Sequence, residues 1–139
     1  MPHETLSLNR QQMQRLGYRV VDMLVDHFEE LPKMPIGRKA SRAEMESQLS
    51  EPLPQEGGDP EAILDTVLSV VMHNIIQVNH PRFFAFIPSP GNFVSVLADA
   101  LASGFNVFAG TWLEGSGPAQ IELVVLDWLR QLCGLPETA

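Results

Sequence analysis

The sequence predicts a mainly α-helical chain, and two observations support that prediction. Apolar residues recur at helical spacing in three long stretches, residues 8–30, 60–78 and 92–104. Prolines and glycines gather between these stretches, where they end helices and start loops. With 139 residues, of which 45% are hydrophobic and 19% charged, the chain has the composition of a globular protein with a modest core.

The first predicted element is an amphipathic helix over residues 8–30. Ser7 or Asn9 can cap its start, because short polar side chains accept hydrogen bonds from the first free backbone N–H groups. Pro32 and Pro35 are expected to end it, because proline cannot continue a helical hydrogen-bond ladder. The apolar stripe of this helix consists of residues four apart, namely Leu16, Val20, Leu24 and Phe28.

Two further helices are expected before the middle of the chain. The first is short and starts after Ser41, because Ser41 and Glu44 have the spacing of a capping box. The prolines and glycines of residues 51–60 then interrupt the chain. Asp59 starts the second helix as its cap, since a proline follows in the first turn, and this helix is predicted to run to about Val78.

The segment from His80 to Gly91 is the most unusual part of the sequence. Prolines at 81, 88 and 90 fix the backbone and remove hydrogen-bond donors, so the segment is expected to be extended and stiff. Connections are normally polar and mobile, so an apolar stiff one is expected to be buried or to line something. On composition alone, filling a core is the commoner of those two roles. The apolar side chains concerned are Phe83, Phe84, Phe86 and Ile87.

The C-terminal third is predicted to hold two helices. Residues 92–104 form the first, whose small side chains allow close packing. A glycine-containing loop over 105–117 follows. Pro118 then opens a last helix, residues 118–133, because proline suits the first helical turn. Gly134 is expected to end it.

Charge and composition exclude several functional classes. The net charge is −8 and the nine cationic residues are scattered, so nucleic acid is not an expected partner. The four histidines have no metal-ligand spacing and no accompanying cysteine, so no metal site is predicted. Asp65 and His73 interrupt the longest apolar run, which argues against a membrane span. Cys133 is the single cysteine, and the first twenty residues are polar, so a cytoplasmic location is expected.

Several motifs, taken in order, resemble the N-terminal part of the group II pyridoxal-phosphate-dependent amino-acid decarboxylases. This family includes the aromatic-amino-acid, tyrosine, histidine and glutamate decarboxylases. The resemblance is dense from about residue 60 to 136 and looser before it. It rests on His80–Pro90, Ser95–Asp99, Gly110–Trp112, Glu122 and Asp127–Leu129.

The resemblance implies a fold, a domain division and a partner. Residues 1–91 would be an N-terminal helical segment for dimerisation that also supplies a substrate wall. Residues 92–139 would begin the cofactor-binding large domain of a type I aminotransferase-like fold, whose α/β body is absent from this sequence. The implied partners are a second copy of the chain or the remainder of the enzyme, together with a small amino-acid substrate.

The resemblance also implies site residues, none of them catalytic. The wall beside the substrate would consist of Phe86, Ile87, Pro88 and Ser89, with His80 before it. A structural hydrogen bond is at least as plausible a role for His80. Phe108 and Trp112 would reach the active site of the neighbouring subunit. Two features depart from the family. Gly110 stands where a bulky residue is frequent, and the animal aromatic decarboxylases tend to have tyrosine and phenylalanine at positions 86 and 87.

The cofactor of this family is pyridoxal 5′-phosphate, which needs a lysine and an acidic partner for its ring nitrogen. Lys33 and Lys39 are the two lysines here, and neither resembles the family's attachment site. The chain is therefore expected to be the leading, inactive piece of a carboxy-lyase that removes the α-carboxylate of an amino acid, with an aromatic substrate favoured. The alternatives are a stand-alone helical interaction module and a small acidic enzyme that uses His80 and Asp99.

Overall fold

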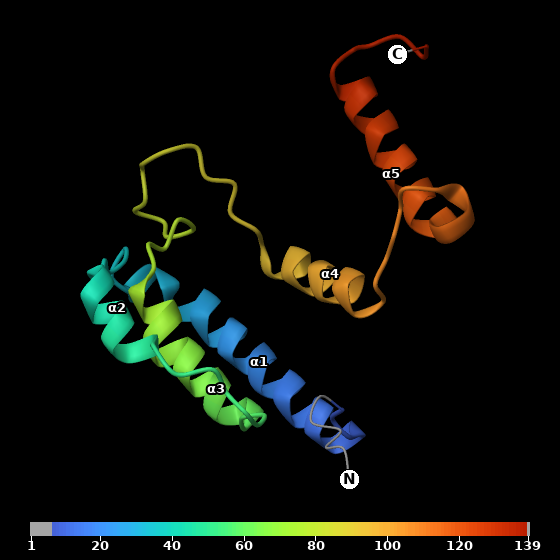
Figure 1. The fold of residues 1–139 in the computed structure, drawn as a ribbon. Helices are drawn as coiled ribbons and strands as arrows, with labels where there is room; N and C mark the ends of the chain where they lie inside the picture. Colours follow the sequence, from blue (N-terminus) through green and yellow to red (C-terminus); the bar gives the residue numbers. More distant parts are fainter. Residues whose placement is uncertain (1–6, 139) are drawn as a thin grey trace. The chain divides into compact units, whose positions relative to one another are not determined.

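The computed structural model describes residues 7–138, and within that range the chain is helical. It divides into two compact units, Met1–Gly91 and Asn92–Ala139. Figure 1 shows the order of their helices along the chain. No described helix is both long and apolar enough to cross a membrane. The roles that the resemblance implies for the two ranges stay predictions.

The first helix, α1, spans Arg10–Glu30, and its prediction is confirmed. Asn9 is the cap. Its side-chain oxygen accepts from the Gln12 N–H at 2.9 Å, while the Gln12 side chain accepts from the Asn9 N–H at 2.9 Å. This reciprocal pair satisfies two backbone donors that a helix start leaves free. A short 3₁₀ turn, η1, covers Leu31–Lys33 and carries Pro32 at its start.

The short helix α2 spans Arg42–Leu49, also as predicted. The Ser41 N–H donates to the Glu44 carboxylate at 2.7 Å, and the Glu44 N–H donates to the Ser41 hydroxyl at 3.2 Å. The backbone and hydroxyl of Ser41 stabilise the ionised carboxylate, which lowers the pKa of Glu44. The capping box read from the sequence is therefore present.

The predicted long helix from Pro60 starts as expected but ends early. Asp59 caps α3, Pro60–Thr66, by accepting from the Glu61 N–H at 3.1 Å. The helix then widens into a π-helical turn, η2, Val67–Val71, and tightens into a 3₁₀ turn, η3, Met72–Asn74. The predicted end at Val78 is wrong, because the backbone is already extended at Ile75.

A backbone bridge explains that early end. Gly37 and Ile76 pair in antiparallel fashion. The Gln77 N–H donates to the Ile36 carbonyl at 2.7 Å, and the Arg38 N–H donates to the Ile75 carbonyl at 3.2 Å. A Cβ on Gly37 would lie 2.6 Å from the Ile75 carbonyl oxygen, so only glycine permits this approach. Residues 75–77 therefore bond to residues 36–38, which follow α1, and do not continue the helix.

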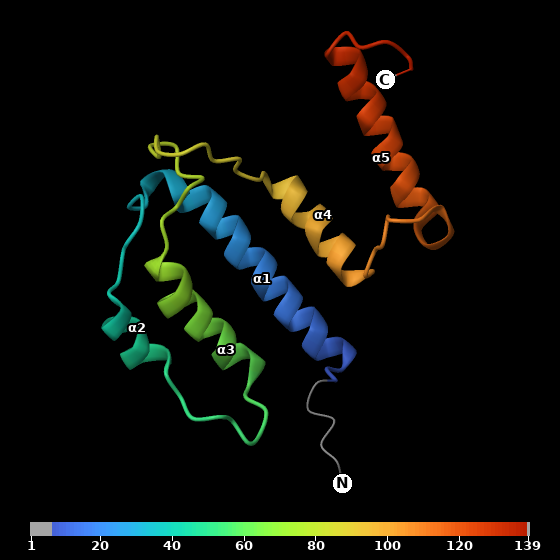
Figure 2. The same cartoon turned by 45° about the horizontal axis from the view of Figure 1, so that its top comes forward.

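Ion pairs join the first half of α1 to α3. The Arg19 guanidinium donates to the Glu61 carboxylate at 3.3 Å and to the Glu61 carbonyl at 3.4 Å, and it also pairs with Asp65. Arg15 pairs with Glu61 as well. The two helices lie side by side in both ribbon views and start at the same end (Figures 1 and 2). They therefore run parallel, held at one end by this arginine clasp and at the other by the Gly37–Ile76 bridge.

The second unit contains α4, Phe93–Gly104, and α5, Trp112–Leu132. Asn92 caps α4 by accepting from the Ser95 N–H at 2.9 Å, and the helix matches the predicted range of 92–104 to within one residue. The long part of α5 begins after a break at Gly115, so the predicted start at Pro118 lies in its first turn, and the short turn before the break was not predicted. Thr111 caps α5, and Gly115 inserts a kink with φ −154° and ψ 54°. Because the backbone is not helical at Gly115, Pro118 falls in the first turn after the kink, where it is tolerated.

The end of α5 matches the prediction. Gly134 has φ +66°, the left-handed conformation that glycine adopts without cost. The Gly134 N–H donates to the Gln131 carbonyl at 3.0 Å, and the Leu135 N–H donates to the Arg130 carbonyl at 3.1 Å. These two bonds form a Schellman motif, which closes the helix.

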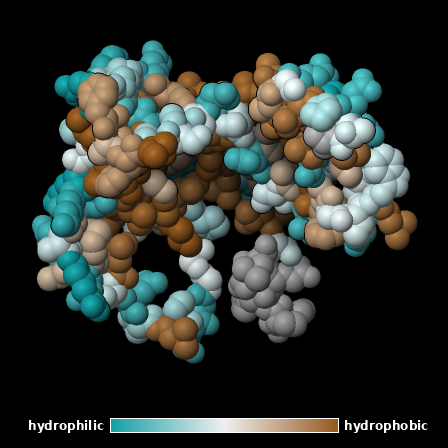
Figure 3. Space-filling model, turned by 90° about the horizontal axis from the view of Figure 1, so that it is seen from above, coloured by the Kyte–Doolittle hydropathy of each residue, from teal (hydrophilic) through white to brown (hydrophobic). Residues whose placement is uncertain are grey.

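Very few described residues are buried, and most apolar side chains face outward. Leu31 is the one apolar side chain of the described residues that is fully buried. Brown apolar atoms are visible over much of the surface in Figure 3. Soluble proteins seldom leave so much apolar surface uncovered, so each unit has faces suited to further packing.

Candidate functional site

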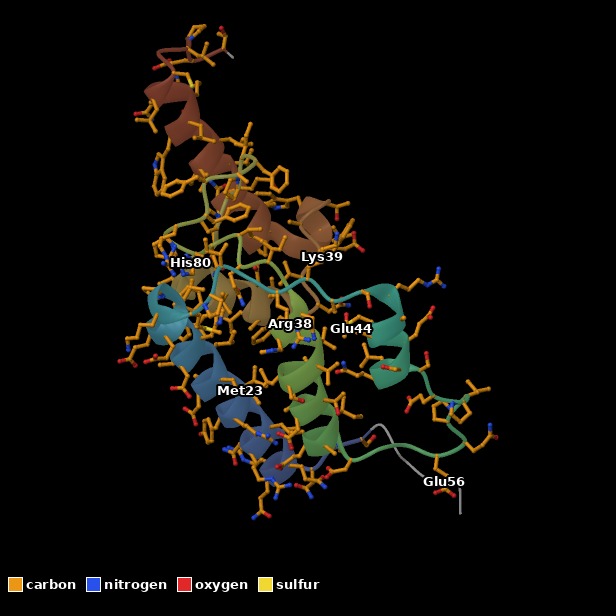
Figure 4. All side chains as sticks on the ribbon, turned by 90° about the vertical axis from the view of Figure 1, so that its left-hand side faces the viewer. Met23, Arg38, Lys39, Glu44, Glu56 and His80 are labelled. Carbon is orange, nitrogen blue, oxygen red and sulfur yellow. The ribbon has the colours of Figure 1, made fainter. Side chains whose placement is uncertain are left out.

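The aromatic loop, residues 80–91, is anchored at its start by a buried histidine. His80 is 3% exposed. Its Nδ1 accepts from the Arg82 N–H at 3.0 Å, which places the proton on Nε2, and Nε2 lies 3.1 Å from the Met34 carbonyl oxygen. In Figure 4, His80 lies by the end of α1. Both ring nitrogens are thus bonded to backbone, which gives His80 a structural role; a substrate contact stays a prediction.

Beyond that anchor, the aromatic loop is exposed. Phe84 is 90% exposed, Phe86 86% and Ile87 99%. Phe83 is half-buried, with its ring centroid 6.1 Å from that of Phe86. The expectation that the loop fills a core is therefore wrong within its own unit. The remaining reading, that the loop lines something outside that unit, stays a prediction.

Phe86 adopts an unusual backbone conformation, with φ +59°. This left-handed region is uncommon for residues other than glycine, asparagine and aspartate, and it costs about 1–2 kcal/mol for a residue with a Cβ. Strained residues cluster at sites where a side chain must be held in one place. The predicted substrate wall begins at this residue and continues through the exposed Pro88 and Ser89.

A second exposed aromatic pair lies in the other unit. Phe108 is 57% exposed and Trp112 60% exposed. Trp112 opens α5, and Thr111 beside it caps that helix through the Glu114 N–H at 3.3 Å. The Phe108 ring lies directly against the Cα of Gly110. The predicted role of these aromatics at a neighbour's active site stays a prediction.

An apolar cavity of about 570 Å³ lies between α1 and the segment from α3 to η3. That volume lies within the range of small-molecule sites. Its lining is largely aliphatic, with His27, His73, Asp26 and Glu30 at its polar edge. No cluster of three metal-ligating side chains is found among the described residues. The sequence did not predict this cavity, because its walls come from helices far apart in the chain.

The two lysines do not fit the attachment of an aldehyde cofactor. Lys33 pairs with Glu30 at 2.7 Å on the surface, and Lys39 is also exposed. Neither lines the cavity. A lysine that forms a Schiff base is normally desolvated, and both of these lysines are exposed. The described residues therefore build no pyridoxal phosphate site.

Sequence reasoning found the exposed aromatics but missed the residues that hold them. Met34 offers the carbonyl that binds His80, and nothing local in the sequence marks it. Gly115 is buried and lies against the Phe108 backbone. The clustering of Gly110, Gly115 and Gly117 was a signal, since glycine is often used where chain segments approach closely.

Comparison with known proteins places these features in a family. The sequence profile of the pyridoxal-dependent decarboxylase conserved domain matches residues 43–139. An aromatic-L-amino-acid decarboxylase from Bacillus atrophaeus is 40% identical over 136 residues, covering 98% of this chain and 28% of that protein. An L-tyrosine/L-DOPA decarboxylase from Lophophora williamsii is 28% identical over 137 residues, covering 99% of this chain and 26% of that protein.

Solved structures agree with the sequence matches. A crystal structure of Oryza sativa TDC with PLP and tryptamine superposes with a TM-score of 0.81 and 25% identity, covering 93% of this chain and 26% of that one. A Catharanthus roseus tryptophan decarboxylase has the same TM-score at 21% identity, covering 93% of this chain and 28% of that one, and it shows the fold alone. The chain spans about a quarter of the length of the relatives that it matches.

Proposed function

We propose, from the premise that this chain belongs to the pyridoxal-dependent decarboxylase family, that it is the N-terminal part of an enzyme acting on aromatic amino acids. The reaction is removal of the α-carboxylate. The observation that carries the proposal is the exposed and strained aromatic loop, which offers Phe86 and Ile87 to a ligand outside its own unit. Relatives named for aromatic and tyrosine substrates support the substrate class.

The cofactor in this proposal is bound by residues outside the chain. Pyridoxal phosphate, when bound, supplies the electron sink for loss of carbon dioxide. The contribution of this chain is geometric. The loop wall, Phe86, Ile87, Pro88 and Ser89, excludes water and restricts how the substrate's carboxylate is oriented. Because Lys33 and Lys39 are on the surface, the chain alone is expected to be inactive.

We further propose that the enzyme is a cytoplasmic homodimer whose interface includes this chain. The exposed apolar residues of α1 and α3, such as Met13, Val21, Val25 and Ile63, favour it. Each such side chain contributes roughly 1.5–3 kcal/mol when it is fully buried. The single exposed Cys133 forms no internal disulfide, which suits a reducing compartment.

The proposal is tested by comparing the isolated chain with the full-length protein that contains it. Each is incubated with pyridoxal phosphate and with phenylalanine, tyrosine or tryptophan, and carbon dioxide release is measured. We expect release from the full-length protein and none from the chain. Carbon dioxide release by the isolated chain would contradict the geometric role. A full-length protein inactive on all three amino acids would contradict the proposed substrate class.

A further inference from the structure

The cavity between α1 and the segment from α3 to η3 has walls that suit an aromatic ring. Met23 on α1 (Figure 4), Met34 after that helix and Met72 in η3 line it, and most of its other walls are valine, leucine and isoleucine. Among the described residues around it, none is phenylalanine, tyrosine or tryptophan. A methionine sulfur makes favourable contacts with aromatic rings, and its unbranched chain adapts to their shape. The cavity therefore offers partners for a ring that it does not itself contain.

A buried amide without a partner also lines this cavity. Gln77 is 7% exposed. Its backbone is fixed on both sides, because its N–H donates to the Ile36 carbonyl at 2.7 Å and its carbonyl accepts from the His80 N–H at 3.0 Å. Its side-chain amide has no hydrogen bond to any other described residue. Buried amides are nearly always bonded, since leaving one unbonded is costly. The Gln77 amide is therefore available to a ligand in the cavity.

The charged groups around the cavity favour a cation. Among the described residues that line it are the carboxylates of Asp26 and Glu30 but no lysine or arginine. Glu30 pairs with Lys33 at 2.7 Å, whereas Asp26 forms no ion pair with a described residue. A carboxylate on a ligand would find no opposite charge here and would be repelled by the like charges. An ammonium would be attracted instead.

The cavity is separate from the residues that favour the proposed dimer. Met13, Val21, Val25 and Ile63, which are exposed and apolar, do not line it. Its volume of about 570 Å³ lies within the range of small-molecule sites. The occupant that fits the walls, the amide and the charge together is a small molecule with an aromatic ring and an ammonium.

We propose that this cavity binds an aromatic monoamine, with the ring among the three methionines and the ammonium held by the Gln77 amide oxygen near Asp26. Loss of the α-carboxylate from an aromatic amino acid leaves an amine of this class, so the identity of the natural ligand rests on the proposed function. The site distinguishes that product from the substrate, because the substrate's carboxylate has no cationic partner in the cavity. The N-terminal part of the enzyme thus binds the amine that the enzyme forms.

Methyl NMR locates the binding. The full 139-residue chain and the full-length protein with bound cofactor are each labelled with ¹³C at the methionine methyl groups and titrated with 2-phenylethylamine. We expect the signals of the three cavity methionines to shift saturably in both proteins. Met13 and Met45 do not line the cavity, so their signals are expected to stay in place and serve as internal controls.

Two analogues test the charge argument by calorimetry on the chain, which has no cofactor to turn them over. Phenylalanine adds a carboxylate to 2-phenylethylamine, and 2-phenylethanol replaces the ammonium with a neutral hydroxyl. We expect 2-phenylethylamine to bind about tenfold more tightly than either, because only the amine brings a positive charge without a negative one.

Matched variants test the polar contacts. Gln77→Met keeps the length of the side chain but removes the amide, and it is expected to weaken 2-phenylethylamine binding about tenfold, whereas Gln48→Met, at an exposed position of α2, is expected to change nothing. Asp26→Asn is expected to weaken binding about threefold, since the carboxylate is exposed, with Asp22→Asn one turn earlier as its control. Thermal unfolding of the same variants separates binding from folding. The unbonded amide predicts that Gln77→Met does not lower Tm.

The outcomes are distinguishable from failure of the proposed function. The inference is overturned if the cavity methionines do not respond in the chain. It is also overturned if they respond in the chain but not in the full-length protein, because a second copy or the rest of the enzyme then fills the cavity. Unchanged affinity in both Gln77→Met and Asp26→Asn overturns it as well. If the full-length protein decarboxylates aromatic amino acids while the cavity stays empty, this inference fails alone. If the amine binds but the protein is inactive on those amino acids, the proposed function fails and the site stands.

Discussion

The two exposed aromatic loops of this chain are held in place in opposite ways. The loop of residues 80–91 is anchored by polar bonds, through the buried His80 ring, and it carries a strained Phe86. The turn around Phe108 starts at Asn106 and Val107, whose N–H groups bond to carbonyls at the end of α4, and its ring depends on the missing side chains of Gly110 and Gly115. A buried side chain therefore anchors one loop, and available space at two glycines positions the ring of the other.

The largest expected effect is loss of the polar anchor. His80→Ala removes the ring acceptor of the Arg82 N–H and leaves the Met34 carbonyl only its 3.4 Å bond from the Arg82 guanidinium; part-buried groups that lose their bonds in this way cost about 1–3 kcal/mol each. We expect the free energy of unfolding of the first unit to fall by about 3 kcal/mol in denaturant titration. The exposed His73→Ala is the control and is expected to be near neutral. If both variants lower the free energy of unfolding equally, the hydrogen bonds of His80 do not anchor the loop.

The next effect tests whether available space also matters in the first unit. Gly37→Ala places a Cβ 2.6 Å from one backbone atom and 2.7 Å from another, so the bridge to Ile76 has to open. Such overpacking costs about 1–3 kcal/mol. Gly17→Ala, at an exposed position of α1 with nothing within 4 Å, is expected to stabilise by about 1 kcal/mol instead. The prediction fails if thermal unfolding shifts in the same direction for both.

A smaller effect isolates the strain at Phe86. Phe86→Gly and Phe86→Ala both remove the ring, but only glycine accepts φ +59° without cost. We expect the glycine variant to be more stable than the alanine variant by about 1 kcal/mol, measured by amide hydrogen exchange in the aromatic loop. At Phe108, which has no positive φ, the glycine variant is expected to be no more stable than alanine. If glycine is more stable than alanine by the same amount at positions 86 and 108, backbone strain does not distinguish the two loops.

The smallest effect concerns exposed carboxylates, where the two units are expected to behave alike. The Ser41 hydrogen bonds lower the pKa of Glu44, and those from Arg130 and Gln131 lower the pKa of Asp127. A lowered folded-state pKa gives stability that is present above the unfolded-state pKa and is lost as pH falls through the folded-state value. Helicity of α2 and α5 should therefore decline below the ordinary values of 4.5 and 3.8.

Two neutral variants test these pH dependences separately. Glu44→Gln is expected to flatten the pH dependence of α2, and Asp127→Asn that of α5, when backbone NMR shifts are followed during acid titration. Each variant serves as the control for the other helix. A decline in α2 that persists unchanged in Glu44→Gln would assign the effect to another group.

Helix starts were predictable from sequence because their causes are local. Asn9, Ser41, Asp59 and Asn92 each accept a bond from an N–H within three residues. The short helical turn from Trp112 to the break at Gly115 was missed, although Thr111 and Glu114 have the same spacing as Ser41 and Glu44. The helix after the break was predicted from Pro118, which lies in its first turn.

Ends and site geometry were less predictable because their causes lie far along the chain. The end of the helical segment after η3 depends on Gly37, which pairs with Ile76 from about forty residues earlier in the sequence, and periodicity alone cannot detect such a partner. The loop aromatics were identified by composition and resemblance, but neither source indicated the left-handed Phe86 backbone or the ring of Phe108 over Gly110. Those features arise from packing between residues that no local pattern connects.

The bridge and the arginine clasp hold α1 and α3 at both ends, while the covalent path between them crosses an exposed stretch of prolines and glycines, residues 51–58. That stretch is a natural place for a protease to cut. The two pieces should then remain associated, because the Gly37–Ile76 bridge and the arginine ion pairs involve no residue of 51–58. The first unit could accordingly be produced as two separate peptides that reassemble on mixing.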